Sequence, residues 1–266
     1  MGGLLAVCAL VIFAYMTILF VTALVRRDNS IADIAWGPGF LVVAVAALAA
    51  TRNATARPIL ATLLTAVWGL RLGVHIFFRN RGRGEDYRYA GWRKAWGRWF
   101  IPRSYLQVFM LQGLFMLLIS SSVMVICRAS ASPLGPLDFA GLAVWLLGFF
   151  FEVVGDRQLA RFKKDPGRRG RIITSGLWRL TRHPNYFGEA TMWWGLFLMA
   201  LAVPGGPLAV VSPVTITVLL RWVSGVPMLE KKYAGDAEFA AYARRTNAFL
   251  PWFPKKDTSG EPAGVI

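Results

Sequence analysis

Cysteine and histidine are scarce in this chain of 266 residues. The two cysteines, Cys8 and Cys127, each lie within or at the end of an apolar run, which excludes a disulfide framework. The two histidines, His75 and His183, are too few for a metal site with three histidine ligands. The composition therefore predicts neither structural disulfides nor a bound metal.

Acidic residues are also few, because 14 Asp and Glu stand against 30 Lys and Arg and leave a formal net charge of +16. A charge of this size fits nucleic acid, anionic lipid or a phosphorylated ligand as a partner. Nucleic acid is the least favoured of the three, since the basic residues alternate with apolar segments instead of lining one soluble face. The chain contains neither a Walker loop nor a nucleophile elbow.

Apolar residues are abundant and make up 56% of the chain. They form seven runs, each close to the ~20 residues that a helix needs to cross a bilayer. The pattern predicts an all-α polytopic membrane protein with seven transmembrane helices, forming a single domain over residues 1–254. The expected helices cover residues 4–25, 33–50, 58–78, 104–127, 137–155, 186–203 and 207–224.

The distribution of Lys and Arg predicts the orientation in the membrane. With the N-terminus outside, the cytoplasmic segments hold 25 of these residues and the outer loops hold 3. We therefore expect an outer N-terminus and a cytoplasmic C-terminus. The loops 79–103 and 156–189 then face the cytoplasm, and so does a tail, 255–266, whose composition predicts disorder.

A basic stretch rich in glycine, Asn80-Arg81-Gly82-Arg83, opens the first long loop. Glycine lets the backbone approach a ligand closely, and guanidinium groups reach phosphate oxygens. A positively charged membrane flank is the alternative interpretation of any single arginine. For the cluster as a whole we favour phosphate binding.

A second stretch, Arg182-His183-Pro184-Asn185-Tyr186-Phe187-Gly188-Glu189, leads into the sixth apolar run. Pro184 is suited to the first turn of a helix, where its missing N–H is not needed. The helix N-terminus would then present free N–H groups to an anion or a carboxamide. Glu189 follows Asn185 by about one turn, so both share a face, and a carboxylate just inside the membrane indicates function.

Glu152 and Asp156 are spaced to share one face at the end of the fifth helix. A solvated helix end, paired with Lys163 or Arg161, explains them as well as a functional role does.

Asp33 opens the second apolar run, and Arg71 with His75 lies in the third. Ionisable groups within a membrane usually pair or line a cavity. We expect Asp33 to face Arg71 or His75, in either a structural or a catalytic contact.

Together these motifs resemble the steroid 5α-reductase and sterol-reductase superfamily, particularly its bacterial branch. The resemblance spans residues 29 to 254 and includes Asn80-Arg81-Gly82-Arg83, Asp156, Arg171 and the 182–189 stretch. Residues 182–189 are also similar to isoprenylcysteine carboxyl methyltransferases, which use S-adenosylmethionine. A multi-pass protein of the bacterial inner (plasma) membrane is the expectation.

The resemblance implies a seven-helix fold that binds NADPH from the cytoplasmic side. It also implies reduction of a carbon–carbon double bond conjugated to a carbonyl, in a lipophilic substrate that enters from the bilayer among membrane lipids. The implied cofactor-binding residues are Asn80, Arg81, Arg83, Asp156, Arg171, His183, Asn185 and Glu189.

The implied catalytic residues depart from the family pattern. Steroid-reducing members use a Glu in the second helix and a Tyr in the third, where this sequence has Trp36 and Gly69. Asp33, one turn away, and Tyr186 are the candidate catalytic residues. The alternatives are a methyltransferase using S-adenosylmethionine on a membrane-embedded acceptor, and a lipid- or cofactor-binding membrane protein without catalysis.

Overall fold

The computed structural model describes residues 2–130 and 132–255. Every regular element in these two ranges is a helix, and neither range contains a strand. The all-α prediction is therefore confirmed for this part of the chain. Apart from Lys255, the tail expected to be disordered, 255–266, lies outside the described residues.

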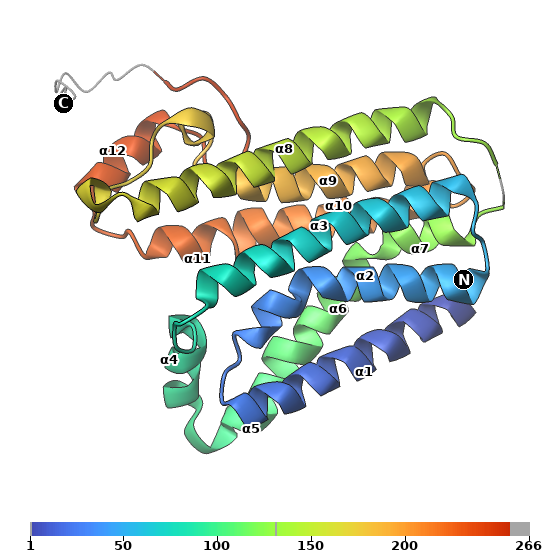
Figure 1. The fold of residues 1–266 in the computed structure, drawn as a ribbon, viewed down its shortest axis with the longest axis horizontal. Coiled ribbons are helices and arrows are strands. Elements are labelled where there is room, and N and C mark those ends of the chain that lie inside the picture. Colours follow the sequence, from blue (N-terminus) through green and yellow to red (C-terminus); the bar gives the residue numbers. More distant parts are fainter. Residues whose placement is uncertain (1, 131, 256–266) are drawn as a thin grey trace. The chain divides into compact units, whose positions relative to one another are not determined.

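The helices follow one another with short connections (Figure 1). The longer ones are α1 (Gly2–Arg26), α2 (Ile31–Thr51), α3 (Ala56–Asn80), α8 (Pro136–Lys164) and α9 (Pro184–Ala200). The shorter ones are α4 (Tyr87–Trp96), η1 (Gly97–Trp99), α5 (Phe100–Ser104), η2 (Tyr105–Met110), α6 (Leu111–Ile119), α7 (Ser121–Arg128), η3 (Pro166–Arg168), η4 (Gly176–Arg179), η5 (Gly206–Val210), α10 (Val211–Val218), η6 (Leu219–Val223), α11 (Val226–Lys231) and α12 (Ala237–Arg245).

Five helical stretches among the described residues are long and apolar enough to cross a membrane, and they mark an integral membrane protein. A sixth is added if the bent pair Tyr87–Ile119 and Ser121–Arg128 forms one span. The sixth expected run corresponds to α9, which has 17 residues. Five or six spans are therefore found, and the count of seven and the orientation stay predictions.

The fourth and fifth expected helices differ from their predicted form. The fourth is bent by 45° between α6 and α7 and begins with π-helical turns in η2. The fifth, α8, continues past residue 155 to Lys164, because polar residues alone do not end a helix and the next proline is Pro166. A turn between α9 and η5 includes Gly205, which has the left-handed conformation at φ 82°.

The described chain divides into two compact units. The first comprises Met1–Leu142 with Trp193–Thr215, and the second comprises Ala143–Met192 with Ile216–Ile266. Whether they act as one domain over residues 1–254 stays a prediction.

In the first unit, α2 packs between α1 and α3 (Figure 1). The contact between α2 and α3 is made by bare backbone, because a methyl group on Gly37 would overlap the carbonyl group of Gly69. Beside it, Phe40 contacts the rings of both Trp68 and Trp193, with centroids 5.3 and 5.0 Å apart. These three side chains are at most 2% exposed and form the centre of this unit.

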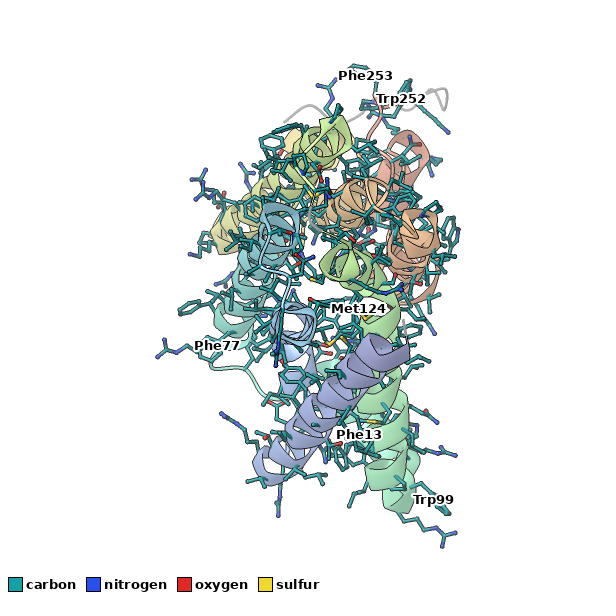
Figure 2. All side chains as sticks on the ribbon, turned by 90° about the vertical axis from the view of Figure 1, so that its right-hand side faces the viewer. Phe13, Phe77, Trp99, Met124, Trp252 and Phe253 are labelled. Carbon is teal, nitrogen blue, oxygen red and sulfur yellow. The ribbon has the colours of Figure 1, made fainter. Side chains whose placement is uncertain are left out.

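Large apolar side chains cover the outside of this unit. Phe13, Phe77 and Trp99 are 52%, 49% and 56% exposed, and Phe77 and Trp99 lie at the edges of the view in Figure 2. Lipid tails solvate such side chains without penalty, so the exposure fits a surface within or at the edge of a bilayer.

One ion pair is buried between α3 and the start of α8. Arg57 donates to both carboxylate oxygens of Asp138, at 2.7 and 2.8 Å, and the two side chains are 5% and 1% exposed. Arg57 also donates to Ser132 and to the carbonyl of Pro133. This bidentate geometry offsets the desolvation of both charges and holds the connection before α8 in place.

Candidate functional site

The site in the second unit depends on a close approach of α8 and α9. A methyl group on Gly188 would overlap the carbonyl oxygen of Gly148 and lie 2.5 Å from the amide nitrogen of Glu152. One turn earlier in α9, Pro184 packs against Gly155 of α8. A methyl group on Gly155 would lie 3.0 Å from the Pro184 ring. The backbones of α8 and α9 therefore touch along this stretch. Short polar side chains on the two helices can then contact one another directly.

This approach brings Asp156 of α8 and Asn185 of α9 together. The Asn185 Nδ2 group donates to Asp156 Oδ1 at 3.2 Å. The Asn185 Oδ1 atom is buried and has no hydrogen-bond partner among the described residues. Glu152, Asp156 and Glu189 are 2%, 7% and 7% exposed, so the solvated helix end considered for the first two was wrong.

Glu230 of α11 joins the two residues that precede α9. Its carboxylate accepts two hydrogen bonds from the Arg182 guanidinium, at 2.8 and 3.0 Å. Its Oε1 atom also lies 2.9 Å from His183 Nε2. Arg182 donates further to the carbonyls of Ala243 and Thr246, so the Arg-His-Pro stretch is tied to the end of α12.

The segment before α9 is held from both sides. The Trp178 indole N–H donates to the carbonyl of Gly155 in α8 at 3.1 Å, and the Tyr242 hydroxyl donates to the carbonyl of Trp178. The hydroxyl of Thr181 donates to the carbonyl of Phe249 at 2.9 Å. These bonds fix the path of the chain into Pro184, which begins α9 as predicted.

His183 is 5% exposed and its ring stacks on Tyr186 at a centroid distance of 5.5 Å. Burial lowers the pKa of His183, although Glu230 acts in the opposite direction. The neutral imidazole then donates from Nε2 to Glu230, whose charge Arg182 already balances. His183, expected to bind cofactor, is thus engaged in holding the start of α9.

A cavity of about 340 Å³ lies in the same unit, between the end of α8 and the segment before η4. Its polar lining comes from Gln158, Arg161, Asp165, Arg168 and Ser175. Arg168 forms an ion pair with Asp165 at 3.0 Å, and Arg161 is exposed. Gln158 accepts from the amide of Leu177 at 3.0 Å, and Gly176, at φ 63°, leaves room for its side chain. Arg171 is exposed in the segment that follows η3.

In the first unit, Asn80-Arg81-Gly82-Arg83 forms a tight turn at the end of α3. The Arg83 amide donates to the carbonyl of Asn80 at 3.0 Å, and Gly82 has φ 76°. With Arg81 at φ −56° and ψ 128°, this is a type II turn, which favours glycine at its third position. Asn80 is half-buried, and Arg81 and Arg83 are exposed.

Asp33 is part of a polar network that the sequence did not predict. Its carboxylate accepts from Arg88 Nη2 at 2.6 Å and from the Tyr89 hydroxyl at 2.7 Å. Both of these partners come from α4, and the expected contact of Asp33 with Arg71 or His75 stays a prediction. Asp33 and Arg88 are 55 positions apart in the sequence, so residue types alone do not show that they pair.

The same network fixes the start of α2. The Asn29 amide donates to Glu85 Oε1 at 2.9 Å, and the Ser30 hydroxyl accepts from the amide of Asp86 at 2.8 Å. Arg93 in turn binds Glu85. Glu85 and Asp86 directly follow the Asn80–Arg83 turn, so these bonds determine where the turn lies within the unit.

The fold and the site together define a class of protein. It is a helical membrane protein with buried acids on two touching helices, namely Glu152 and Asp156 on α8 and Glu189 on α9. The chain belongs to the family described as "Protein of unknown function (DUF1295)", which it matches over residues 19–246. Its similarity to steroid 5-alpha-reductases also confirms the steroid 5α-reductase-like superfamily. The bacterial branch and the kinship with methyltransferases stay predictions.

Three relatives illustrate the similarity. An uncharacterized protein of Schizosaccharomyces pombe is 27% identical over 169 residues, 54% of this chain and 48% of the relative. The steroid 5-alpha-reductase DET2 of Arabidopsis thaliana is 39% identical over 66 residues, 24% of this chain and 25% of its own. The 3-oxo-5-alpha-steroid 4-dehydrogenase 1 of Bos taurus is 34% identical over 76 residues, 28% and 29% of the two chains.

The chain spans about half the length of the first of these relatives and about a quarter of the other two. No solved structure matches it.

The contact between α8 and α9 predicts that a larger residue at Gly188 lowers the stability of the fold. The change Gly188→Ala places a methyl group against backbone atoms of α8, which cannot move aside as a side chain would. We expect the free energy of unfolding in detergent to fall by about 1–3 kcal/mol. In the control Gly91→Ala, nothing lies within 4 Å of the new methyl, and α4 should be slightly stabilised. Equal melting temperatures for Gly188→Ala and the unchanged chain would contradict the contact.

The lowered pKa of His183 predicts that acid destabilises the fold. Above its ordinary pKa of ~6.5, the residue is neutral in both the folded and the unfolded chain. As the pH falls further, the unfolded chain takes up the proton first, because burial disfavours the charged form in the fold. The free energy of unfolding then decreases by at most about 1.4 kcal/mol per pH unit.

Thermal unfolding between about pH 7.5 and pH 5.5 measures this effect. The variant His183→Gln should lose the pH dependence, and His75→Gln, which removes the other histidine of the chain, should keep it. A slope that survives in His183→Gln would assign the titration to another group.

Proposed function

We propose that this protein is a membrane-embedded, NADPH-dependent reductase of a carbon–carbon double bond in a lipophilic substrate. The double bond is conjugated to a carbonyl, as in an enone. Two of the similar proteins are named as steroid reductases or dehydrogenases, which supports this class of reaction. The observation that carries the proposal is the pair formed by Asp156 and Asn185.

This pair fits a cofactor that carries an amide group. Because Asn185 Nδ2 is used by Asp156, the orientation of the Asn185 amide is set, and its buried Oδ1 atom still lacks a donor among the described residues. A buried acceptor without a partner is unfavourable, so a ligand N–H at this atom would stabilise the complex. The carboxamide end of the cofactor would be held by Asn185, Asp156 and Glu189, which lie where α8 and α9 meet.

The phosphate end of the cofactor is assigned to basic residues. In the second unit, Arg161 and Arg168 line the 340 Å³ cavity, and Arg171 is exposed beyond η3. The turn that exposes Arg81 and Arg83 next to Asn80 belongs to the first unit, and its part in cofactor binding stays a prediction from the sequence. Guanidinium groups bind phosphate in a bidentate manner and would favour NADPH over NADH.

When bound, NADPH supplies a hydride to the β carbon of the double bond. The protein has to polarise the carbonyl oxygen with a proton donor and deliver a proton to the α carbon. Both oxygens of Asp33 accept hydrogen bonds, and one of them takes the single hydroxyl proton of Tyr89. Tyr89 would therefore donate to a substrate carbonyl only after its hydroxyl turns away from Asp33. Tyr186, stacked on His183, is the second candidate donor.

Cofactor binding gives the first test. Asn185→Ala and Glu189→Ala should each weaken NADPH binding to the purified protein by roughly tenfold or more, because each removes a buried partner of the ligand. Asn247→Ala is the matched control, since Asn247 uses its main-chain carbonyl to bind the amide of Arg182. Titration calorimetry with NADPH and, separately, S-adenosylmethionine measures the affinities. Unchanged NADPH affinity in both variants, or heat only with S-adenosylmethionine, would reject the reductase.

Turnover of a panel of lipophilic enones gives the second test. Replacement of the proton donor should lower kcat by about 10²–10⁴ and leave the affinity for NADPH unchanged. Tyr89→Phe and Tyr186→Phe each remove one hydroxyl and keep the ring, so each serves as the control of the other. Full kcat in both variants would exclude both tyrosines, and NADPH binding without turnover of any enone by the unchanged chain would indicate a non-catalytic protein.

A further inference from the structure

The segment from α4 to α5 carries a cationic strip. Residues 87–103 contain five Lys and Arg and no Asp or Glu. Arg88 and Arg93 are neutralised by Asp33, Asp86 and Glu85. Three further cations are exposed and form no ion pair with any acid in residues 2–130 and 132–255: Lys94, Arg98 and Arg103. We refer to these three residues as the cationic strip.

Indole rings accompany the strip. Trp92 and Trp96 stack at a centroid distance of 5.4 Å with their planes 12° apart. The Arg98 guanidinium lies 5.8 Å from the ring centre of Trp99, which is 56% exposed and points outward (Figure 2). Tryptophan prefers the boundary between hydrocarbon and headgroups. The strip therefore belongs at the depth where lipid phosphates lie.

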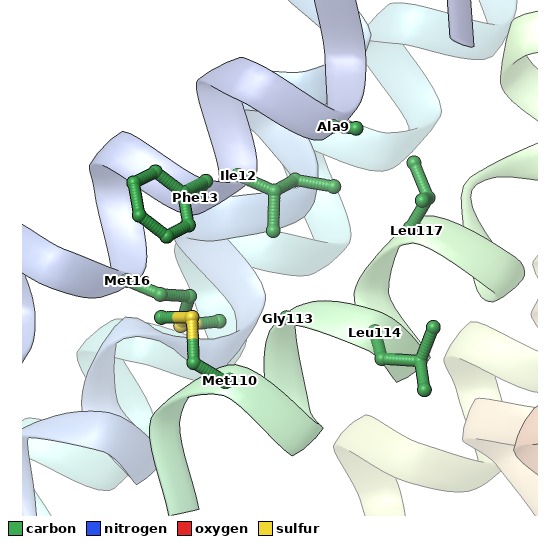
Figure 3. Close-up of a pocket in the computed structure, with 8 residues that line it drawn as sticks. All are labelled: Ala9, Ile12, Phe13, Met16, Met110, Gly113, Leu114 and Leu117. Carbon is green, nitrogen blue, oxygen red and sulfur yellow. The ribbon is translucent and has the colours of Figure 1, made fainter. Parts of the chain in front are cut away.

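An apolar groove lies in the same unit, between α1 and the helix formed by η2 and α6 (Figure 3). It encloses about 160 Å³ and all eight of its lining residues are apolar. Gly113 opens it by lacking a side chain, since a methyl there would lie 3.1 Å from Ile12 and 3.2 Å from Met16. Phe13 and Leu114 on its two walls are each 52% exposed, so the groove is open to the surrounding bilayer.

The groove and the strip lie on one continuous helical path. Helical residues run from Phe100 through η2 to Ile119 without interruption. Met110 and Leu117, which line the groove, follow Arg103 by 7 and 14 residues, or about 10 and 20 Å at 1.5 Å per residue. One leaflet of the hydrocarbon core is about 15 Å thick. An acyl chain that starts at the level of Arg103 therefore reaches the groove.

The first turns of this path also lie beside α1. The hydroxyls of Thr17 and Tyr105 are 3.1 Å apart, and the ring of Phe20 is 4.9 Å from that of Tyr105. These contacts fix both walls of the groove to the helix that bears Arg103, so headgroup and acyl chain would meet one preformed surface.

We propose that the cationic strip and the groove form a single binding site for an anionic phospholipid. Its phosphate binds Arg98 and Arg103, with Lys94 nearby, and one of its acyl chains occupies the groove between α1 and α6. The site is separate from the α8–α9 residues assigned to the cofactor, so it stands or falls independently of the reductase activity.

The test uses the full chain in nanodiscs of phosphatidylcholine with a minor fraction of phosphatidylglycerol. After mild detergent extraction, mass spectrometry measures which lipids remain bound. The unchanged chain should retain phosphatidylglycerol well above its share of the nanodisc. High salt should reduce this enrichment, because it screens the exposed guanidinium groups. Equal retention of the two lipids at low salt would overturn the proposal without any variant.

Two variants separate the two parts of the site. Arg98→Gln/Arg103→Gln should lower phosphatidylglycerol retention by about fivefold for each cation removed. Ala9→Phe fills the groove and should also lower retention, with the charges intact. Arg52→Asn/Arg128→Gln, which removes two exposed arginines at the ends of α2 and α7, is the matched control for net charge.

A melting temperature close to that of the unchanged chain establishes that each variant is folded. If Arg52→Asn/Arg128→Gln lost as much phosphatidylglycerol as Arg98→Gln/Arg103→Gln, the effect would come from net charge alone. That result would overturn the proposal. Unchanged retention in Ala9→Phe would also overturn it, since the acyl chain would then not occupy the groove.

Discussion

The direct contact between the backbones of α8 and α9 is the constraint on which the second unit depends. Helices in a bilayer gain little from hydrophobic association, because lipid tails are as apolar as the side chains, and close packing of small residues takes its place. Here Gly148 and Gly188 allow the backbones of the two helices to touch. Asp156 and Asn185 can then share a hydrogen bond with short side chains. A wider spacing would need longer residues, whose rotamers are harder to fix.

Features that depend on neighbouring residues could be predicted from the sequence. The long apolar runs predicted seven spans, of which five or six are found. The missing N–H of Pro184 predicted the first turn of α9, and the spacing of Asn185 and Glu189 predicted a shared face. The bend between α6 and α7 was missed, because the three serines at 120–122 were included in the expected helix 104–127.

Features that depend on distant pairing could not be predicted. Glu230 gave no signal in the sequence, although it binds Arg182 and His183 from 48 and 47 residues away. The pairing of Asp33 with Arg88 and Tyr89 is of the same kind. In both cases an acid has several basic residues available, and only the packing of the helices decides which of them it meets.

The contacts of Glu230 with Arg182 and His183 determine when the candidate site can form during synthesis. Domains tend to fold from the N-terminus as synthesis proceeds. Arg182 and His183 emerge from the ribosome long before their partners at Glu230, Ala243 and Thr246. The segment that leads into α9 therefore lacks these contacts during translation, and Arg182 is not yet bound to Glu230. The candidate site acquires its final form only when the last helices have been synthesised, so an interrupted or frameshifted message yields a membrane-inserted chain that lacks it.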